Sequence, residues 1–435
     1  MLIGFRVQNW RSIRNEASFS MLASQEKQHG ERLQKNDKYR FRLLPTALMF
    51  GGNAAGKSNF IHALSFMRNF ILKSPQANQR IPGYSPYSFD ETTINGPSKF
   101  EIEILIDDFI YRYSFTINAT TVLKEELVRI LTTREQTLFV REGKEKFELD
   151  ESYLRDESQK LRLRFVFQGT QENELYLSNT VDQNVEQFKP INDWFAQNLV
   201  IIDPSTQLFT QSVSPLLKIC NQYMQLLDTS VKRLEFKEVS RSFLPKEIFD
   251  DLRENMPTNA LSMLVNSRGE RFFLRKNDDN SIDIQLLFSF HEATDGKKYQ
   301  LNFSDESDGT KRLLDLLPAF VDNNDNSTII IDEIDRSLHS ILTKQLFSFF
   351  LEKSKLCFNK QIIATTHDLQ LMTQELFRRD EMWIFEQRED GTKLIPLSDF
   401  EDIRYDKDIR KSYLEGRMGG IPQVMLPLPE IEDCE

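Results

Sequence analysis

Hydrophobic and polar residues alternate along the first part of the chain with the period of two that β-strands show. Residues 1–20 predict a pair of strands, and residues 99–118 predict an antiparallel hairpin. Further short strands are expected through about residue 149, so this region predicts an antiparallel β lobe. The polar and charged stretch 24–42 predicts an exposed loop.

The last third of the chain alternates short apolar runs with amphipathic stretches. This pattern predicts helices over 310–320, 338–353 and 369–378, and strands over 328–331, 361–366 and 382–386. Buried strands that alternate with helices indicate a parallel sheet, and the fold class is therefore α/β.

The middle of the chain mixes both patterns. Apolar positions from Val213 to Leu227 predict an amphipathic helix, and a continuation as far as Leu234 stays open. Two strand-like stretches follow, over Arg271–Leu274 and Ile282–Phe290.

Composition and charge exclude several classes of protein. Hydrophobic residues make up 40% of the 435-residue chain and charged residues 28%, and no apolar run approaches the ~20 residues that span a bilayer. The three cysteines lie far apart in the sequence, which fits a reducing compartment, so we expect a cytoplasmic protein without disulfides or a membrane partner. The net charge of -11 argues against an obligate nucleic-acid ligand, although a local basic groove stays possible.

The strongest chemical signal is the segment Gly-Gly-Asn-Ala-Ala-Gly-Lys-Ser at residues 51–58, between an apolar strand and a helix. It satisfies the phosphate-loop pattern, in which backbone N–H groups close around phosphate oxygens. Lys57 would contact the β- and γ-phosphates of ATP, and Ser58 would bind Mg²⁺ at the start of the helix. The predicted nucleotide-binding residues of this segment are Gly51, Gly52, Asn53, Ala54, Ala55, Gly56, Lys57, Ser58 and Asn59.

Two later strands end in residues that suit a magnesium-bound triphosphate. Strand 328–331 precedes Asp332, which would bind Mg²⁺, and Glu333, which would polarise an attacking water. Alone, this pattern is weak, because a strand that ends in a solvated turn explains it equally well. Strand 361–366 precedes His367, and parallel pairing would set this histidine at the same sheet edge.

The segment Ser307-Asp308-Gly309-Thr310 precedes an amphipathic helix. Ser307 can cap that helix, and Gly309 lets the backbone approach a ligand closely. A plain helix cap would explain the serine by itself, but the order of all four elements favours a nucleotide site.

That order resembles soluble ABC-type ATPases of the RecF, SMC and OLD group, in which a Ser-Gly-Gly-Gln signature closes over ATP bound by another subunit. Two of the four signature positions differ here. The chain is more similar to AAA family ATPases linked to abortive infection. The shared segments are Phe5-x-Val-x-Asn-Trp10, Ser307-x-Gly-Thr-Lys-Arg312, Asp332-Glu-Ile-Asp-Arg-Ser-Leu-His339, Thr365-Thr-His-Asp368 and Tyr413-Leu-x-Gly-Arg-x-Gly-Gly-Ile-Pro422.

The resemblance implies an ABC-type ATPase head, a phosphate-loop parallel sheet flanked by helices, with an antiparallel β lobe and a short helical insertion. Residues 1–150 would form the first part of the head with the β lobe, and 151–295 a helical and β insertion. Residues 296–422 would form the second part of the head, followed by a flexible tail over 423–435.

The resemblance also implies how the residues divide between subunits of a dimer or higher oligomer. The residues that would act together in one subunit are Lys57, Ser58, Asp332, Glu333 and His367, with Lys57, Glu333 and His367 catalytic. The neighbour would supply Ser307 and Gly309, and Asp335 would couple the two sites. The Q-loop glutamine of the family cannot be placed, since Gln76, Gln79 and others are equal candidates.

Four functions are compatible with the sequence. The first is an antiphage ATPase that senses infection and controls a separately encoded nuclease or toxin, and the second is a RecF-like DNA-repair ATPase that binds DNA. The third, a transporter's nucleotide-binding subunit, is disfavoured by the interposed β lobe. The fourth is a scaffold that binds ATP without hydrolysis, and Glu333 argues against it because a scaffold needs no general base.

Overall fold

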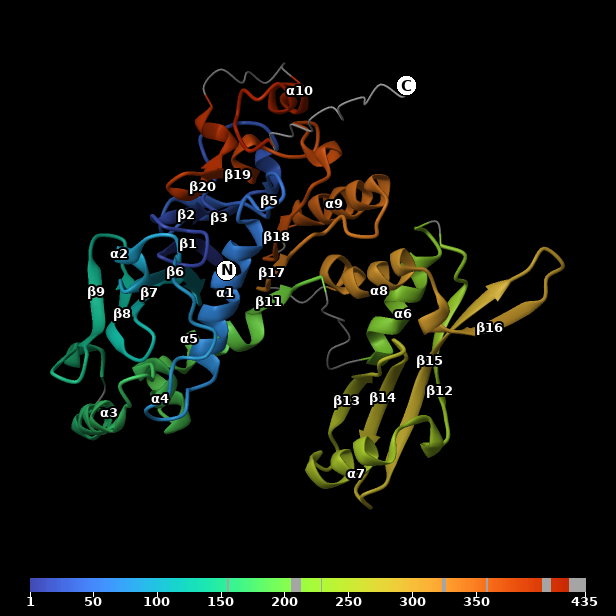
Figure 1. Ribbon diagram of the computed structural model, residues 1–435, viewed down its shortest axis with the longest axis horizontal. Coiled ribbons are helices and arrows are strands. Elements are labelled where there is room, and N and C mark those ends of the chain that lie inside the picture. The colour runs from blue at the N-terminus through green and yellow to red at the C-terminus, as the bar shows by residue number, and fades with distance from the viewer. Residues whose placement is uncertain are drawn as a thin grey trace, which may run out of the picture. The chain divides into compact units, whose positions relative to one another are not determined.

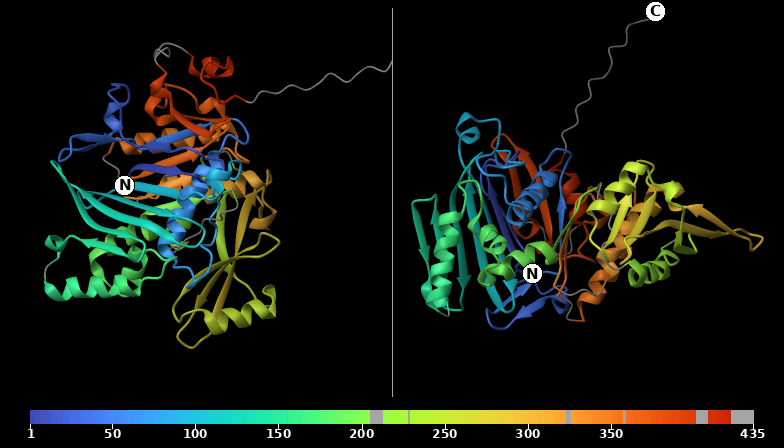
Figure 2. Two further views of the ribbon diagram at one scale, coloured as in Figure 1. Left: turned by 60° about the vertical axis from the view of Figure 1, so that its left-hand side comes forward. Right: turned by 90° about the horizontal axis from the view of Figure 1, so that it is seen from below.

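A computed structural model of the chain describes residues 1–154, 156–204, 213–227, 229–322, 326–356, 359–400 and 408–421, and the predicted tail lies outside them. The chain forms two compact units (Figures 1 and 2). Unit 1 comprises Met1–Ile201, Asp325–Glu333 and Leu351–Glu435, and unit 2 comprises Ile202–Asn324 and Ile334–Phe350. Among the described residues, no helix has the length and apolar character needed to cross a bilayer.

The predicted β lobe is a seven-stranded antiparallel sheet of unit 1. In sheet order its strands are β10 (Lys146–Leu149), β9 (Glu135–Glu142), β8 (Val122–Ile130), β7 (Phe109–Ile117), β6 (Ser98–Ile106), β1 (Leu2–Gln8) and β2 (Ala17–Ser20). In β6 the buried Phe100, Ile102 and Ile104 alternate with more exposed charged residues. This alternation turns one face of the sheet toward the core, as the sequence predicts.

Unit 1 also holds the predicted parallel sheet. In sheet order its strands are β11 (Leu199–Ile202), β17 (Thr328–Ile331), β18 (Gln361–Thr365), β5 (Thr46–Phe50), β19 (Met382–Arg388) and β20 (Gly391–Pro396). Every residue of β5, β17 and β18 is buried, because a parallel sheet is covered on both faces. The α/β fold class is confirmed.

Helix α1 (Lys57–Leu72) lies between the two sheets of unit 1. Its Phe60 ring contacts Phe5 of β1 and Phe19 of β2, and it also contacts Phe385 of β19. These contacts join both sheets and the helix that follows the phosphate loop in one core. The other helices of unit 1 are α2 (Glu91–Ile94), α3 (Glu157–Gly169), α4 (Tyr176–Asp182), α5 (Lys189–Asp193) and α10 (Ile409–Leu414), with a π-helical turn at Trp194–Asn198.

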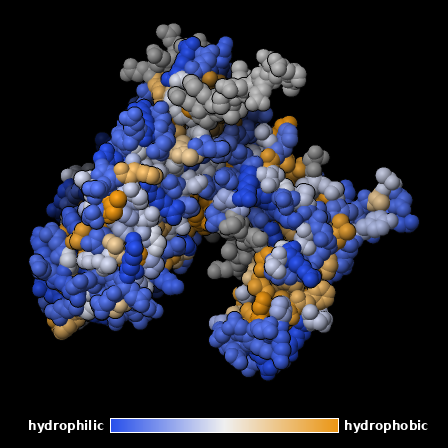
Figure 3. Space-filling model, in the orientation of Figure 1, coloured by the Kyte–Doolittle hydropathy of each residue, from blue (hydrophilic) through white to orange (hydrophobic). Residues whose placement is uncertain are grey.

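Unit 2 is built on a second antiparallel sheet. Its strands are β12 (Arg233–Glu238), β15 (Ile282–Glu292), β14 (Arg271–Lys276) and β13 (Leu261–Val265) in sheet order, with β16 (Lys298–Asn302) paired to β15. Phe249 of α7 (Lys246–Asn255) packs in a core with Phe272 and Leu286. The remaining helices are α6 (Val213–Met224), α8 (Asp308–Val321) and most of α9 (Ser340–Ser354). Figure 3 shows apolar residues gathered at the surface over this sheet.

One predicted helix is wrong, and the extension that stayed open for the middle helix is absent. The continuation of the middle helix to Leu234 does not occur, because residues Arg233–Glu238 pair with β15 as a strand. The segment 369–378 contains only a short 3₁₀ turn at Leu369–Leu371. Its carbonyl groups accept tertiary hydrogen bonds instead, and the Leu376 oxygen is 2.8 Å from the Arg32 guanidinium.

The stretch 24–42 is also not the exposed loop that its polarity predicts. It contains a two-stranded sheet, β3 (Gln34–Asn36) with β4 (Phe41–Leu43), and its Arg32 is buried. Arg32 donates to Glu381 at 2.7 Å, while buried Arg378 donates to both carboxylate oxygens of Asp380 at 2.8 and 2.7 Å. Arg378 also donates to the carbonyls of Glu26 and Gln28. Buried charge pairs, which polarity alone does not reveal, therefore hold this stretch on the core.

Arg378→Met should lower the free energy of unfolding by about 3–5 kcal/mol, because it leaves the Asp380 carboxylate buried without its guanidinium. Arg164→Met is the matched control, since Arg164 is 60% exposed and pairs with Glu151 at the surface. An exposed pair contributes about 0–1 kcal/mol. Urea denaturation followed by circular dichroism measures both variants, and equal losses would contradict the role of the buried cluster.

Candidate nucleotide site

The predicted phosphate loop connects β5 to α1 by a turn in which two glycines leave no space for a Cβ. A Cβ on Gly51 would lie 2.5 Å from the Phe385 carbonyl oxygen, and a Cβ on Gly56 would lie 2.2 Å from Thr392 Oγ1. Both glycines have positive φ, at 152° and 99°. The β19–β20 hairpin therefore packs closely against the loop, and the two glycines allow this close packing.

Lys57 begins α1 and is folded back over the loop. It is only 6% exposed, and its Nζ donates to the carbonyl oxygens of Gly51 at 2.7 Å and Gly52 at 3.0 Å. Those bonds hold the ammonium group above the turn, where a phosphate chain would lie.

The N-terminal strands supply a support for the start of α1 that sequence reasoning missed. Asn59 Nδ2 donates to Ser12 Oγ at 2.8 Å, and Ser12 Oγ lies 2.9 Å from Thr392 Oγ1. Ser12 lies two residues after Trp10, where the N-terminal segment of the family resemblance ends. The closeness of Ser12 to this segment was the available signal, but the sequence alone does not show that Ser12 contacts Asn59.

Parallel register brings the other predicted residues of unit 1 to the same sheet edge. Ile331 of β17 pairs with Ala364 of β18, which pairs with Leu48 of β5. The residues that follow these strands, Asp332, Thr366 and the phosphate loop, therefore leave the sheet side by side.

Thr365 links the two acidic residues at this edge. Its Oγ1 donates to Asp332 Oδ1 and accepts from the Glu333 backbone N–H at 2.8 Å. Asp332 is buried, and Glu333 is half-buried with a left-handed backbone of φ 50°. The threonine thus orients one carboxylate and fixes the turn that carries the other, a role its sequence position did not reveal.

His367 follows β18 and is exposed. The Thr366 N–H before it donates to the Met49 carbonyl at 3.0 Å, which joins this turn to the end of β5. The structure therefore places His367 at the edge that carries Lys57 and Asp332, as parallel pairing predicts.

Three predicted site residues belong to unit 2. Ser307 caps α8 by accepting from the Thr310 N–H at 3.1 Å. A Cβ on Gly309 would lie 2.8 Å from the Ser337 carbonyl oxygen, so the glycine permits contact between the helix start and the loop that follows Asp335. Within unit 2, the signature-like segment and that loop form one local structure.

The groups of unit 1 fit a nucleotide with magnesium. The loop offers backbone N–H groups and an ammonium for phosphates, while the Ser58 hydroxyl and the Asp332 carboxylate are hard oxygen donors of the kind that Mg²⁺ prefers. Across the described part of the chain, no group of three or more His, Cys, Asp or Glu could hold a metal. Magnesium bound through one carboxylate and substrate phosphates needs no such group.

Residues 47–373 match the family model described as "AAA domain, putative AbiEii toxin, Type IV TA system". The chain belongs to this AAA family. The match includes the phosphate loop, the Asp332 and Glu333 pair and His367. The chain therefore carries an ATPase domain of the AAA kind. A search of curated proteins found no match.

Three solved structures resemble the AAA protein. The SMC head domain from Thermotoga maritima is 13% identical with a TM-score of 0.34, over 91% of this chain and 98% of that one. The Smc head domain of Pyrococcus furiosus bound to the C-terminal domain of ScpA is 10% identical with a TM-score of 0.32, over 91% and 95%. The Smc head domain with a coiled coil and joint from Pyrococcus yayanosii is 11% identical with a TM-score of 0.35, over 96% and 99%. At these TM-scores the likeness supports no functional argument.

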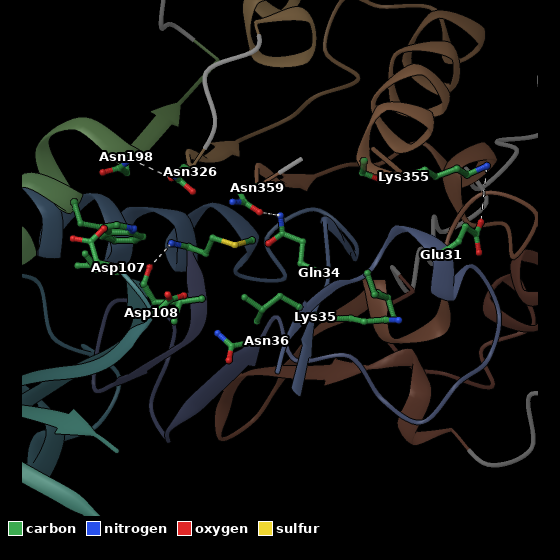
Figure 4. A pocket seen from close by; sticks show the side chains of 17 residues that line it. Glu31, Gln34, Lys35, Asn36, Asp107, Asp108, Asn198, Asn326, Lys355 and Asn359 are labelled. Atoms are coloured by element: carbon green, nitrogen blue, oxygen red, sulfur yellow. Dashed lines mark hydrogen bonds and ion pairs between the residues drawn. The ribbon is translucent and has the colours of Figure 1, made fainter. Parts of the chain in front are cut away.

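Two pockets lie at opposite edges of the parallel sheet of the AAA domain. One, of about 830 Å³, is beside the phosphate loop and is lined by Gly52, Asn53, Ala55, residues 386–390, Gly420 and Ile421. The other, of about 630 Å³, lies where β17 and β18 begin, and Figure 4 shows Asn326 and Asn359 there with Gln34 bonded to Asn359. None of the predicted site residues lines the second pocket.

Thr365→Val should destabilise the AAA domain by about 1–3 kcal/mol, because Asp332 and the Glu333 N–H both lose a buried partner. Thr343→Val is the matched control, since the buried Thr343 hydroxyl has no hydrogen-bond partner among the described residues. That change should be neutral or stabilising. Denaturant unfolding measures both, and an unchanged Thr365→Val protein would contradict the bridging role.

Proposed function

We propose that this AAA protein binds ATP with Mg²⁺ and hydrolyses it between two copies of the chain. The observation that carries the proposal is the shared sheet edge, where Lys57, Asp332 and Glu333 follow neighbouring parallel strands. An ammonium, a buried carboxylate and a less buried carboxylate at one edge are the groups that phosphoryl transfer to water requires.

The residues of unit 1 have separate tasks in this proposal. Lys57 and the N–H groups of residues 51–59 bind the phosphates, and Ser58 and Asp332 hold Mg²⁺. Bound magnesium would neutralise the charge that develops on the phosphate oxygens. Glu333 accepts a proton from the attacking water, and Thr365 keeps its turn in place. His367 donates a hydrogen bond toward the γ-phosphate.

The residues of unit 2 act on the nucleotide of the other copy. Ser307 and the first N–H groups of α8 suit an anion, because the helix is 14 residues long and its start carries a partial positive charge. Gly309 lets the start of α8 pack against the Ser337 carbonyl, and Asp335 couples the two sites. The active protein is then a dimer or a higher oligomer.

We further propose that the protein works in the cytoplasm as an antiphage regulator of a separately encoded nuclease or toxin. The family description names a toxin of a toxin–antitoxin system, which supports a role in such defence. The net charge of -11 suits control of another protein better than tight binding to nucleic acid. Copurification with the product of a neighbouring gene tests the effector, and DNA-stimulated hydrolysis would instead favour the DNA-repair function.

Glu333→Gln should lower kcat for ATP hydrolysis about 10²–10⁴-fold, because it removes the general base. The variant should retain ATP and shift toward the assembled state, which light scattering after gel filtration measures. Lys57→Ala should instead weaken ATP binding itself.

Glu172→Gln is the control, since this carboxylate is 64% exposed and lies outside the site. It should behave as the wild type in every measurement. Equal and negligible turnover by the wild type and by Glu333→Gln would contradict hydrolysis and leave an ATP-binding scaffold.

A further inference from the structure

The C-terminal motif that supports the family resemblance lies against the phosphate loop. It forms a short strap, residues 418–421, which follows α10. The Gly52 N–H donates to the Gly420 carbonyl oxygen at 2.9 Å. The Tyr413 hydroxyl at the end of α10 donates to the same oxygen at 2.8 Å. The proposed function gives this contact no task.

The strap depends on two glycines that no larger residue could replace without movement. A Cβ on Gly419 would lie 2.5 Å from Glu386 Oε1, and a Cβ on Gly420 would lie 2.7 Å from Ile384 Cγ2. Both residues have left-handed φ, at 70° and 72°. The strap is therefore shaped to reach the loop across β19.

The Gly51–Gly52 peptide group is held at both ends. Its carbonyl oxygen accepts from Lys57 Nζ at 2.7 Å, and its N–H donates to Gly420. Fixing the N–H fixes the plane of the whole peptide group, and therefore the direction of the oxygen that holds Lys57. The strap thus acts on the ammonium group through one rigid unit.

Tyr413 keeps the accepting oxygen in place. Its hydroxyl comes from a buried ring, and burial raises the pKa of the Tyr413 hydroxyl, so the group stays a donor across the physiological range. The Gly420 oxygen then has two donors, one from the loop and one from α10, and its position is set by both.

We propose that Tyr413 and Gly420 are positioning residues, which set the phosphate loop and Lys57 for a triphosphate chain. This inference rests on the proposed function for its ligand. Because the strap acts on the loop, its ligand class is the polyphosphate part of the nucleotide. Tyr413 and Gly420 should therefore affect ATP and inorganic triphosphate alike.

The test measures the binding of ATP and inorganic triphosphate, each with Mg²⁺, to the full-length chain by calorimetry. Tyr413→Phe should weaken both about three- to tenfold, which corresponds to the loss of one hydrogen bond. Gly420→Ala should weaken both more than about tenfold, because strain and collision displace the strap.

Two control variants make the same types of substitution at positions that do not contact the phosphate loop. Tyr39→Phe removes a hydroxyl that also donates to a carbonyl, that of Ile130 at 2.9 Å. Gly416→Ala adds a Cβ at a similar φ of 78°, but no atom lies within 4 Å of it. Both should bind the two ligands as the wild type does.

A split between KM and kcat separates positioning from a general loss of structure. Positioning raises KM for ATP in step with the dissociation constant, while kcat at saturating ATP stays within about twofold. A partly unfolded variant lowers kcat at constant KM, and this result would overturn the proposal. So would wild-type affinity in both variants while Lys57→Ala loses binding. If the wild type binds neither ligand, the proposed function itself fails.

Discussion

Parallel pairing of β17, β18 and β5 places three chain segments at one sheet edge, and the candidate site depends on that register. A shift by one residue would turn every strand side chain to the opposite face, and Thr365 would no longer reach Asp332. Burial enforces the register, because all residues of these strands are apolar or bonded within the core. The same register therefore stabilises the sheet and sets the geometry of the acidic pair.

Close approach to the glycine backbone is the second requirement. Gly51, Gly56 and Gly420 each occupy positions where a Cβ would meet an atom of the β19–β20 hairpin. The hairpin packs against both the loop and the strap, so the loop shape depends on a strand more than 300 residues later in the chain. Such contacts hold the loop in one shape, with Lys57 bonded to the carbonyl oxygens of Gly51 and Gly52.

Sequence patterns reveal local geometry well and tertiary partners poorly. The β lobe and the strands that end at Asp332 and His367 were predictable, because alternation and apolar runs report burial directly. The supporting roles of Thr365, Ser12 and Gly420 were not, since each acts through a partner distant in sequence. The segment 369–378 shows the converse error, where an amphipathic pattern yields to tertiary hydrogen bonds from Arg32 and its neighbours.

Both ends of the described chain support the same turn. Ser12 bonds the first turn of α1, and Gly420 bonds the loop that precedes it. The shape of residues 50–60 therefore depends on contacts with segments near both termini. Nucleotide binding then requires an assembled unit 1, and a ligand that binds this loop stabilises the whole unit and not the loop alone. That coupling ties nucleotide occupancy to the integrity of the parallel sheet, which also carries the two carboxylates.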